Sequence, residues 1–594
     1  MVAREFNLGR DDALYASTPP LEALRLIISH AATIEPGKER REVRVHDVRR
    51  AYFYAKQQRE VYIELPEEDE DAEPGQVGKL MLCLYGTRDA AKEWQKTLSR
   101  HLVSIGFVAG RGHPSIFAHP TRDIKMLVHG DDYFPSGAGK DLDWLESELG
   151  KAYEIQTQRL GIGPGRETEV KILNRIVRWT ASGLEMEADP RHSELVVKQL
   201  GLEGCRPLSS PGIEGKDEED LETDEPLSDE LATKYRGVVA RINYLAADRP
   251  DIQYATKEAC RDMSRPSSGS YRRLERIGKY LVGKPRLIWH FELQGPISYV
   301  DAFADANWAG CRQSRKSTSG GTLIIGSHLI KTWSKTQATI AKSSAESELY
   351  GIVRATVESM GLLTLIGDLG GSIKARLHMD STAAKGIIDR EGLSKVRHLD
   401  VNVLWLQEQM ARDSVPILKV LGTENNADLT TKHLSHDMIG KHIKRMAMEF
   451  RGGRSEKASN LQSVSAKNRA ERITRAVNCI ENLRDKYAEK NVGDDWISRG
   501  AGGKWIRAHR TARKSLFTPC RVPRGPAHPD MFSVVRRTIG VNNKGNKFEI
   551  VDNWKDSHCS HRLMEDPWTG TTEFITKGAA KMLGYREDEL EDTA

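Results

Sequence analysis

Three aspartates near the start of the chain have the residue types and spacing of a divalent metal site. Asp131 and Asp132 follow the apolar run at 124–129, so we expect them at the turn of a β-hairpin. Adjacent carboxylates repel each other, and proteins often leave such a pair exposed in a turn. A divalent cation would instead hold them together, because Mg²⁺ prefers hard oxygen ligands. Asp47 ends an alternating strand pattern and is followed by aromatic residues, and it is the expected third carboxylate.

Four further acids stand where expected strands end or expected helices begin. Asp305 ends an alternating strand, and Asp380 ends the apolar strand RLHMD. Glu348 lies in the first turn of a long helix from Ser344, and Asp428 lies where the last helix is expected to begin. Acids in a first helical turn often interact only with the helix dipole, which is the alternative for Glu348 and Asp428. As a set of four, these carboxylates match the ligands of a two-metal phosphoryl-transfer site.

Glu346 competes with Glu348 for this place on the long helix. Glu348 is preferred because it lies beside the expected buried face of the helix. That face comprises Leu349, Ile352, Val353 and Met360.

Motifs around both sets of acids resemble the Pol polyprotein of copia-type LTR retrotransposons, which carries a reverse transcriptase followed by an RNase H. The first part of the resemblance lies in DVRRAY at 47–52, VYIELP at 61–66, LYGTRDAAKEW at 84–94, Asp131-Asp132, YRG at 235–237, YLA at 244–246 and RPDI at 249–252. The second part lies in RKSTSG at 315–320 and WSKTQ at 333–337.

For the polymerase, the resemblance implies that Asp47 and Asp131 ligate two Mg²⁺ or Mn²⁺ ions, with Asp132 as the supporting acid. Tyr52 would exclude the ribose 2′-OH of the incoming nucleotide, and Gly86 would lie beneath the template and nucleotide. The implied partners are an RNA template, a DNA primer and deoxynucleoside triphosphates.

For the RNase H, the resemblance implies that Asp305, Glu348 and Asp380 hold two further ions, with Asp428 as a fourth catalytic acid. The implied substrate is an RNA/DNA hybrid, recognised through its shape and phosphates.

The chain departs from the family pattern in two places. His129-Gly130 replaces the family's Tyr-Val before the paired aspartates, and only 46 residues precede Asp47. We therefore expect an N-terminal truncation that removes most of the fingers and their triphosphate-binding cations. Three interpretations stay open: a polymerase with RNase H, a chain in which only the RNase H is active, and a non-catalytic remnant that binds nucleic acid.

The expected fold is an α+β reverse transcriptase palm and connection, an α/β RNase H-like domain with a mixed five-stranded sheet and helices, and a largely irregular basic tail. The expected domains are a palm at 1–212, an acidic linker at 213–230, a helical thumb or connection at 231–296, the RNase H-like domain at 297–442 and the tail at 443–594. Expected strands in the palm include 61–65, 79–86 and 124–130, and a helix is expected at 21–32.

Composition restricts the remaining classes of function. The 594 residues contain no run of about 20 apolar residues, so we expect no membrane span. The seven scattered cysteines favour a reducing compartment inside the cell, in cytoplasm or nucleus, over a disulfide framework. The oligomeric state stays open.

A basic segment lies in the tail. Lys504, Arg507, Arg510 and Arg513 recur at three-residue spacing and would form a nucleic-acid-binding stripe on a helix. The alternative is a solvated charge run.

Overall fold

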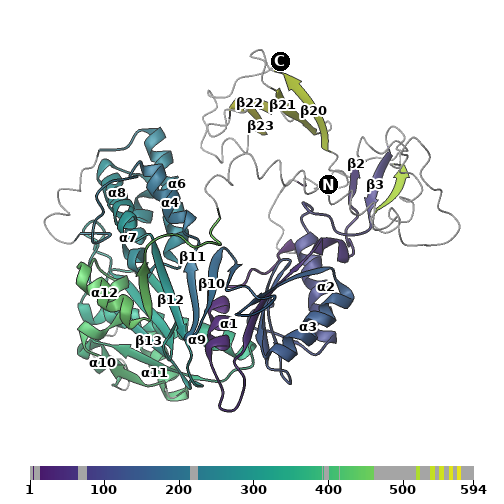
Figure 1. Cartoon of the computed structure of the whole chain (residues 1–594). Coiled ribbons are helices and arrows are strands. Elements are labelled where there is room, and N and C mark those ends of the chain that lie inside the picture. The colour runs from purple at the N-terminus through teal and green to yellow at the C-terminus, as the bar shows by residue number, and fades with distance from the viewer. Residues whose placement is uncertain are drawn as a thin grey trace. The chain divides into compact units, whose positions relative to one another are not determined.

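The computed structural model describes residue 5, residues 14–64, 76–213, 225–390, 392, 400–413 and 415–459, and five strands between 517 and 576 (Figure 1). The chain divides into two compact units. The larger unit comprises Ser17–Arg49 and His101–Asn468, and the smaller unit comprises Met1–Ala16, Arg50–Arg100 and Arg469–Ala594. The basic stripe at 504–513 and most of the acidic segment predicted as a linker lie outside the described residues.

The larger unit begins with helix α1 and a six-stranded antiparallel sheet in the order β4-β5-β6-β7-β1-β8. Helix α1 (Leu21–Ala32) forms at its predicted position, because its apolar residues are buried on nearly every side. It packs on β6 and β7, and α3 (Gly139–Ala152) packs on β1, β7 and β8. The strands are β1 (Glu42–Val48), β4 (Val108–Ala109), β5 (Ile116–His119), β6 (Ile124–His129), β7 (Asp132–Gly137) and β8 (Ile155–Leu160).

A second, antiparallel sheet has the order β18-β12-β11-β10-β9. Its strands are β9 (Glu169–Ile172), β10 (Arg175–Thr180), β11 (Gly183–Ala188), β12 (Arg286–Glu292) and β18 (Met448–Arg451). The last strand falls in the segment that we assigned to the tail, yet it pairs with β12 from Arg286↔Arg451 to Trp289↔Met448.

Four helices pack together beside this sheet (Figure 1). They are α4 (Arg191–Leu200), α6 (Asp229–Ala246), α7 (Pro250–Arg261) and α8 (Ser268–Gly283). Their starts follow from the sequence: Ser228 caps α6, Pro250 opens α7, and Ser267 with Ser270 forms a capping box at α8. The mainly helical character predicted for this segment is present.

The third sheet is mixed and has the order β15-β14-β13-β16-β17. The strands β13, β14 and β15 pair antiparallel, whereas β16 and β17 join β13 in parallel. They comprise β13 (Tyr299–Asn307), β14 (Thr318–Ile325), β15 (His328–Thr336), β16 (Lys374–Met379) and β17 (Ile417–Lys419). This is the mixed five-stranded sheet that the sequence predicts for an RNase H-like domain.

Helices cover the mixed sheet. The long helix α9 (Ser344–Asp368) packs on β13, β14 and β16, and α10 (Thr382–Ile388) and α11 (Asp400–Asp413) pack on α9. A 3₁₀ helix, η6 (Asn426–Thr430), packs on β13 and β14, and α12 (His436–Arg445) closes the segment. Among the described residues α9 alone has the length and hydropathy of a membrane span, and it packs here as a core helix.

Buried Arg25 joins these layers within the larger unit. Its guanidinium donates to the Ile330 carbonyl oxygen of β15 at 2.9 Å and pairs with Asp248 at 2.9 Å, over the Trp289 ring of β12. Because a buried charge is costly unless it is paired and hydrogen-bonded, this arrangement fixes α1 against both five-stranded sheets.

In the smaller unit, β2 (Tyr62–Glu64), β3 (Gln76–Leu80) and β19 (Phe517–Arg521) form one sheet, and β20 (Val535–Val541) with β21 (Lys547–Asn553) and β22 (His561–Glu565) with β23 (Thr572–Thr576) form two hairpins. The strand predicted at 79–86 is wrong beyond Leu80. Cys83 and Leu84 are buried instead just before a turn, in which the Thr87 amide donates to the Leu84 carbonyl oxygen. Helix α2 (Ala90–Ser104) follows this turn.

Candidate metal centres

Asp305 lies near the end of the central strand of the mixed sheet and is 5% exposed. Its cross-strand partner on β14 is Gly320. A Cβ atom on Gly320 would collide with Thr430 and Thr431. Glycine in the STSG motif therefore allows the segment that carries Asp428 to pack directly against β14 beside Asp305.

Glu348 reaches the same place from α9. Ser343 caps this helix by accepting from the Glu346 amide, and the Glu346 carboxylate accepts from the Lys342 amide at 2.8 Å. Glu346 thus stabilises the helix start, and Glu348 faces Asp305 as expected, one residue past the first turn. Met360, expected on the buried face, is 41% exposed. It lies twelve residues after Glu348, and at about 3.6 residues per turn this places it a third of a turn away from the side of the helix that carries Glu348.

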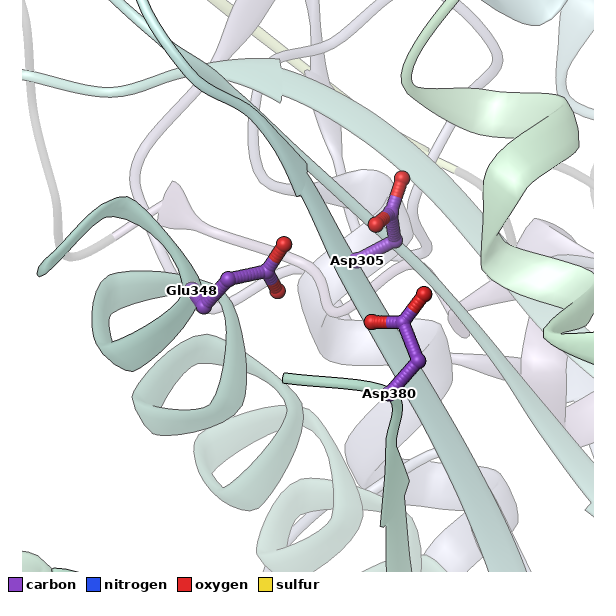
Figure 2. Close-up of side chains that lie close together, drawn as sticks. All are labelled: Asp305, Glu348 and Asp380. Atoms are coloured by element: carbon purple, nitrogen blue, oxygen red, sulfur yellow. The ribbon is translucent and has the colours of Figure 1, made fainter. Parts of the chain in front are cut away.

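Asp380 completes a cluster of three carboxylates directly after β16. Figure 2 shows Asp305, Glu348 and Asp380 pointing toward one another from strand, helix and strand end. One carboxylate oxygen from each lies within 4.8 Å of the others. We call these three residues the carboxylate triad.

Asp428 approaches the triad on η6 rather than on the last helix, which begins only at His436. The prediction that Asp428 starts that helix is therefore wrong: the Asn425 side chain caps a single 3₁₀ turn instead. Asn425 also donates to the Ala304 carbonyl oxygen at 2.8 Å, and the Thr431 hydroxyl donates to the Asp305 carboxylate. These bonds hold the Asp428 segment against β13.

The electrostatics of this site are those of crowded, partly buried acids. Burial, followed by repulsion from Asp305 and Asp380, raises the pKa of Glu348 to about 9. Burial and Asp305 raise the pKa of Asp428 to about 7, and the same two causes raise the pKa of Asp380. Without a cation, the cluster is therefore under charge repulsion.

The residues present fit a divalent cation. The triad supplies hard oxygen donors close together, and Glu348 Oε2 is buried without a hydrogen-bond partner among the described residues. Such an oxygen in a native structure needs an explanation, and a metal ion is one.

The other three predicted catalytic acids also come together. Asp47 on β1 lies directly opposite Asp132 on β7, and the Val48 amide donates to the Asp131 carbonyl oxygen at 2.9 Å. Burial, then Asp131 and Asp47, raise the pKa of Asp132 to about 7. Burial and Asp131 also raise the pKa of Asp47. We call these residues the hairpin carboxylates.

The departure from the family pattern falls at the turn of this hairpin. His129 pairs with Asp132, which leaves Gly130 and Asp131 as the turn. The hairpin lies where it was predicted, but of the two aspartates only Asp131 is in the turn, and Asp132 begins β7. Gly130 has φ +65°, a conformation that glycine adopts without strain. Glycine therefore shapes the turn that presents Asp131.

Tyr52 and Gly86 belong to the smaller unit. The Tyr52 ring contacts the Tyr85 ring at 4.4 Å between centroids, and Gly86 has φ +95°. Their roles in nucleotide and template binding stay predictions.

Relatives of the sequence include retroelement proteins. The retrovirus-related Pol polyprotein from transposon RE1 of Arabidopsis thaliana is 26% identical over 401 residues, which are 66% of this chain and 26% of that protein. The corresponding polyprotein from transposon TNT 1-94 of Nicotiana tabacum is 25% identical over 450 residues, which are 73% of this chain and 33% of that protein. The chain is a homologue of copia-type retrotransposon Pol polyproteins. It spans about a quarter to a third of the length of these curated relatives.

No family model matches the sequence. A solved structure of the N-terminal RNase H domain of a Mycobacterium tuberculosis protein, fused to maltose-binding protein, matches 25% of this chain and 98% of its own chain, with 17% identity and a TM-score of 0.17.

In this Pol homologue, sequence reasoning missed three residues beside the carboxylates. Asn425 and Thr431 hold the Asp428 segment, and Lys432 Nζ lies 2.9 Å from Asp428 Oδ1. The spacing of Asp428 and Lys432, four residues apart, was an available signal for the ion pair. Nothing in the pattern distinguished Asn425 from an ordinary loop asparagine.

Proposed function

We propose that this chain cleaves the RNA strand of RNA/DNA hybrids in a reaction that depends on Mg²⁺ or Mn²⁺. The observation that carries the proposal is the triad of Asp305, Glu348 and Asp380, with an oxygen of each within 4.8 Å of the others. The RKSTSG and WSKTQ motifs on the adjoining strands support it.

Each residue has a distinct part in this proposal. Asp305, Glu348 and Asp380 would hold the cations, with Asp428 beside them as a fourth acid. Bound divalent cations activate a water molecule and stabilise charge on the phosphate that is attacked. Thr431 orients Asp305 through its hydroxyl, and Asn425 fixes the segment that carries Asp428.

The test is cleavage of a labelled RNA/DNA hybrid by the purified full chain with Mg²⁺ or Mn²⁺. Asp305→Asn removes a ligand at nearly constant shape and should abolish cleavage. Asp437→Asn, an exposed acid in the first turn of α12, is the matched control and should keep it. Equal cleavage by wild type and Asp305→Asn would contradict the proposal.

A second candidate function is RNA-templated DNA synthesis at the hairpin carboxylates. The observation that favours it is Asp47 opposite Asp132 in register, with Asp131 in the adjoining turn. Here Asp47 and Asp131 would hold the cations, so that a primer 3′-OH can attack the α-phosphate of a deoxynucleoside triphosphate. Asp132 would support them.

Primer extension on an RNA template tests this candidate, with Asp131→Asn as the inactivating change and Asp437→Asn as the control. Primer extension that survives Asp131→Asn would refute the role of Asp131 as a metal ligand. Hybrid cleavage without any extension would mean that only the RNase H is active. Absence of both activities, with nucleic-acid binding retained, would mean a non-catalytic binding protein.

A further inference from the structure

Among the residues that the structure describes, Lys432 is the one residue of opposite charge that forms an ion pair with an acid of the proposed RNase H site. It lies four residues after Asp428, and its Nζ is 2.9 Å from Asp428 Oδ1. The Asp428 side chain is 10% exposed and that of Lys432 is 36% exposed. The ammonium group therefore reaches a sheltered carboxylate from the solvent side.

The attraction is not limited to Asp428. Burial lowers the pKa of the Lys432 ammonium, but Asp305, Asp428 and Asp380 outweigh burial and raise it. Lys432 therefore remains a cation beside three carboxylates, close to where a divalent ion would be attracted.

The triad and Asp428 differ in this respect. Asp305, Glu348 and Asp380 form the compact group, and Asp428 is not part of it. Glu348 Oε2 has neither a hydrogen bond nor an ion pair among the described residues, whereas Asp428 Oδ1, which also lacks a hydrogen bond, has the Lys432 ammonium at 2.9 Å. The triad is thus open to a cation, while Asp428 already has one.

We propose that Lys432 is a built-in counter-cation that occupies Asp428 in the metal-free protein and so weakens a second divalent-ion position between Asp428 and Asp305. The triad would bind the first ion, and the second would bind only as the ammonium leaves Asp428. Lys432 is in this sense a positioning residue, and the inference rests on the proposed metal-dependent function.

Binding of Mn²⁺ to the full chain tests this directly, by calorimetry or by electron paramagnetic resonance of free Mn²⁺. All variants carry Asp131→Asn, so that the hairpin carboxylates contribute less to the measurement. Lys432→Met keeps the aliphatic stem and removes the charge. We expect the weaker Mn²⁺ dissociation constant to fall about tenfold, or a second binding step to become measurable, because a like charge beside the ion has been removed.

Two controls separate charge from packing. Lys432→Arg keeps the cation and should keep the weak second step, and Lys441→Met removes an exposed charge from α12 and should change nothing. If Lys432→Met does not fold, as judged by its melting transition, Lys432→Gln provides the same test with a polar side chain.

The outcomes distinguish this inference from the proposed function. Unchanged Mn²⁺ affinity in Lys432→Met, combined with weakened binding in Asp305→Asn, would overturn the role of Lys432 and leave the metal site standing. Unchanged Mn²⁺ binding in Asp305→Asn would remove the metal site itself, and the inference with it.

Discussion

The side-chain amide of Asn425 donates a 2.8 Å hydrogen bond to the carbonyl oxygen of Ala304, the residue before Asp305. Asn425 is fully buried, and the same side chain caps η6 by accepting from the Ala427 amide at 3.2 Å. One side chain therefore connects the strand that carries Asp305 to the turn that carries Asp428.

We expect Asn425→Ala to lower the free energy of unfolding by about 1–3 kcal/mol, since it leaves a buried carbonyl oxygen without its donor. Mn²⁺ binding at the triad should weaken in parallel. Denaturant unfolding and Mn²⁺ titration measure the two effects, with Asn243→Ala on the exposed face of α6 as control. Stability equal to that of the control would show that the bond to Ala304 contributes nothing.

Local sequence signals predicted the parts of both sites that regular structure positions. The paired aspartates follow an apolar strand and a glycine, and they lie at a hairpin as predicted, with Asp131 in the turn and Asp132 as the first residue of β7. Asp305 lies near the end of β13 and Asp380 directly follows β16. These two strands pair with each other in parallel, so the two carboxylates meet at the same edge of the sheet. Their assignment as ligands stays a prediction.

The errors arise where tertiary contacts outweigh local pattern. Asp428 lies on a 3₁₀ turn because Asn425 and Thr431 bond to β13, contacts over more than a hundred residues that no short window contains. After Leu80 the apolar run leaves the sheet, with Met81 exposed, Cys83 and Leu84 buried and a turn from Leu84 to Thr87, and apolarity alone does not separate such a segment from a strand. The Lys432 pair was within reach of sequence reasoning, since it has helical spacing.

Glu348 makes the metal-free protein less stable as the pH rises. Its pKa is about 9 when folded, against an ordinary 4.5, so the folded state binds more protons than the unfolded state between these values. The contribution of protonated Glu348 to the free energy of unfolding is fully present below about pH 4.5 and is lost as the pH rises through about 9.

We therefore expect Glu348→Gln to raise the melting temperature in EDTA, with a gain over wild type that grows up to about pH 9. Glu346→Gln, two residues earlier, keeps an acceptor for the Lys342 amide and should follow the wild-type pH profile. Parallel profiles for wild type and Glu348→Gln would mean that Glu348 is not held among like charges.

Asp132 should also make the metal-free protein less stable as the pH rises, over a narrower range of pH. Its folded pKa of about 7 exceeds the ordinary 3.8, so its contribution is present below about pH 3.8 and is lost as the pH rises through about 7. Asp132→Asn should raise the melting temperature in EDTA by an amount that levels off above pH 7, unlike Glu348→Gln. A gain that keeps growing to pH 9 would place Asp132 in a more buried environment than the structure gives it.

Gly320→Ala tests how closely the Asp428 segment packs on β14. The added methyl group would meet Thr430 and Thr431, whose backbone and side chains adjoin Asp428 and Asp305. Overpacking of this kind costs about 1–3 kcal/mol of stability, and the displaced segment should also weaken Mn²⁺ binding. Both are measured as for Asn425→Ala.

The matched control is Gly386→Ala in α10, where an added Cβ meets no atom within 4 Å. That change should leave Mn²⁺ binding unaltered and stabilise the helix by up to about 1 kcal/mol, because alanine has the higher helix propensity. If Gly320→Ala were as stable as Gly386→Ala and bound Mn²⁺ as wild type does, the close approach of Thr430 to β14 would not be what positions Asp428.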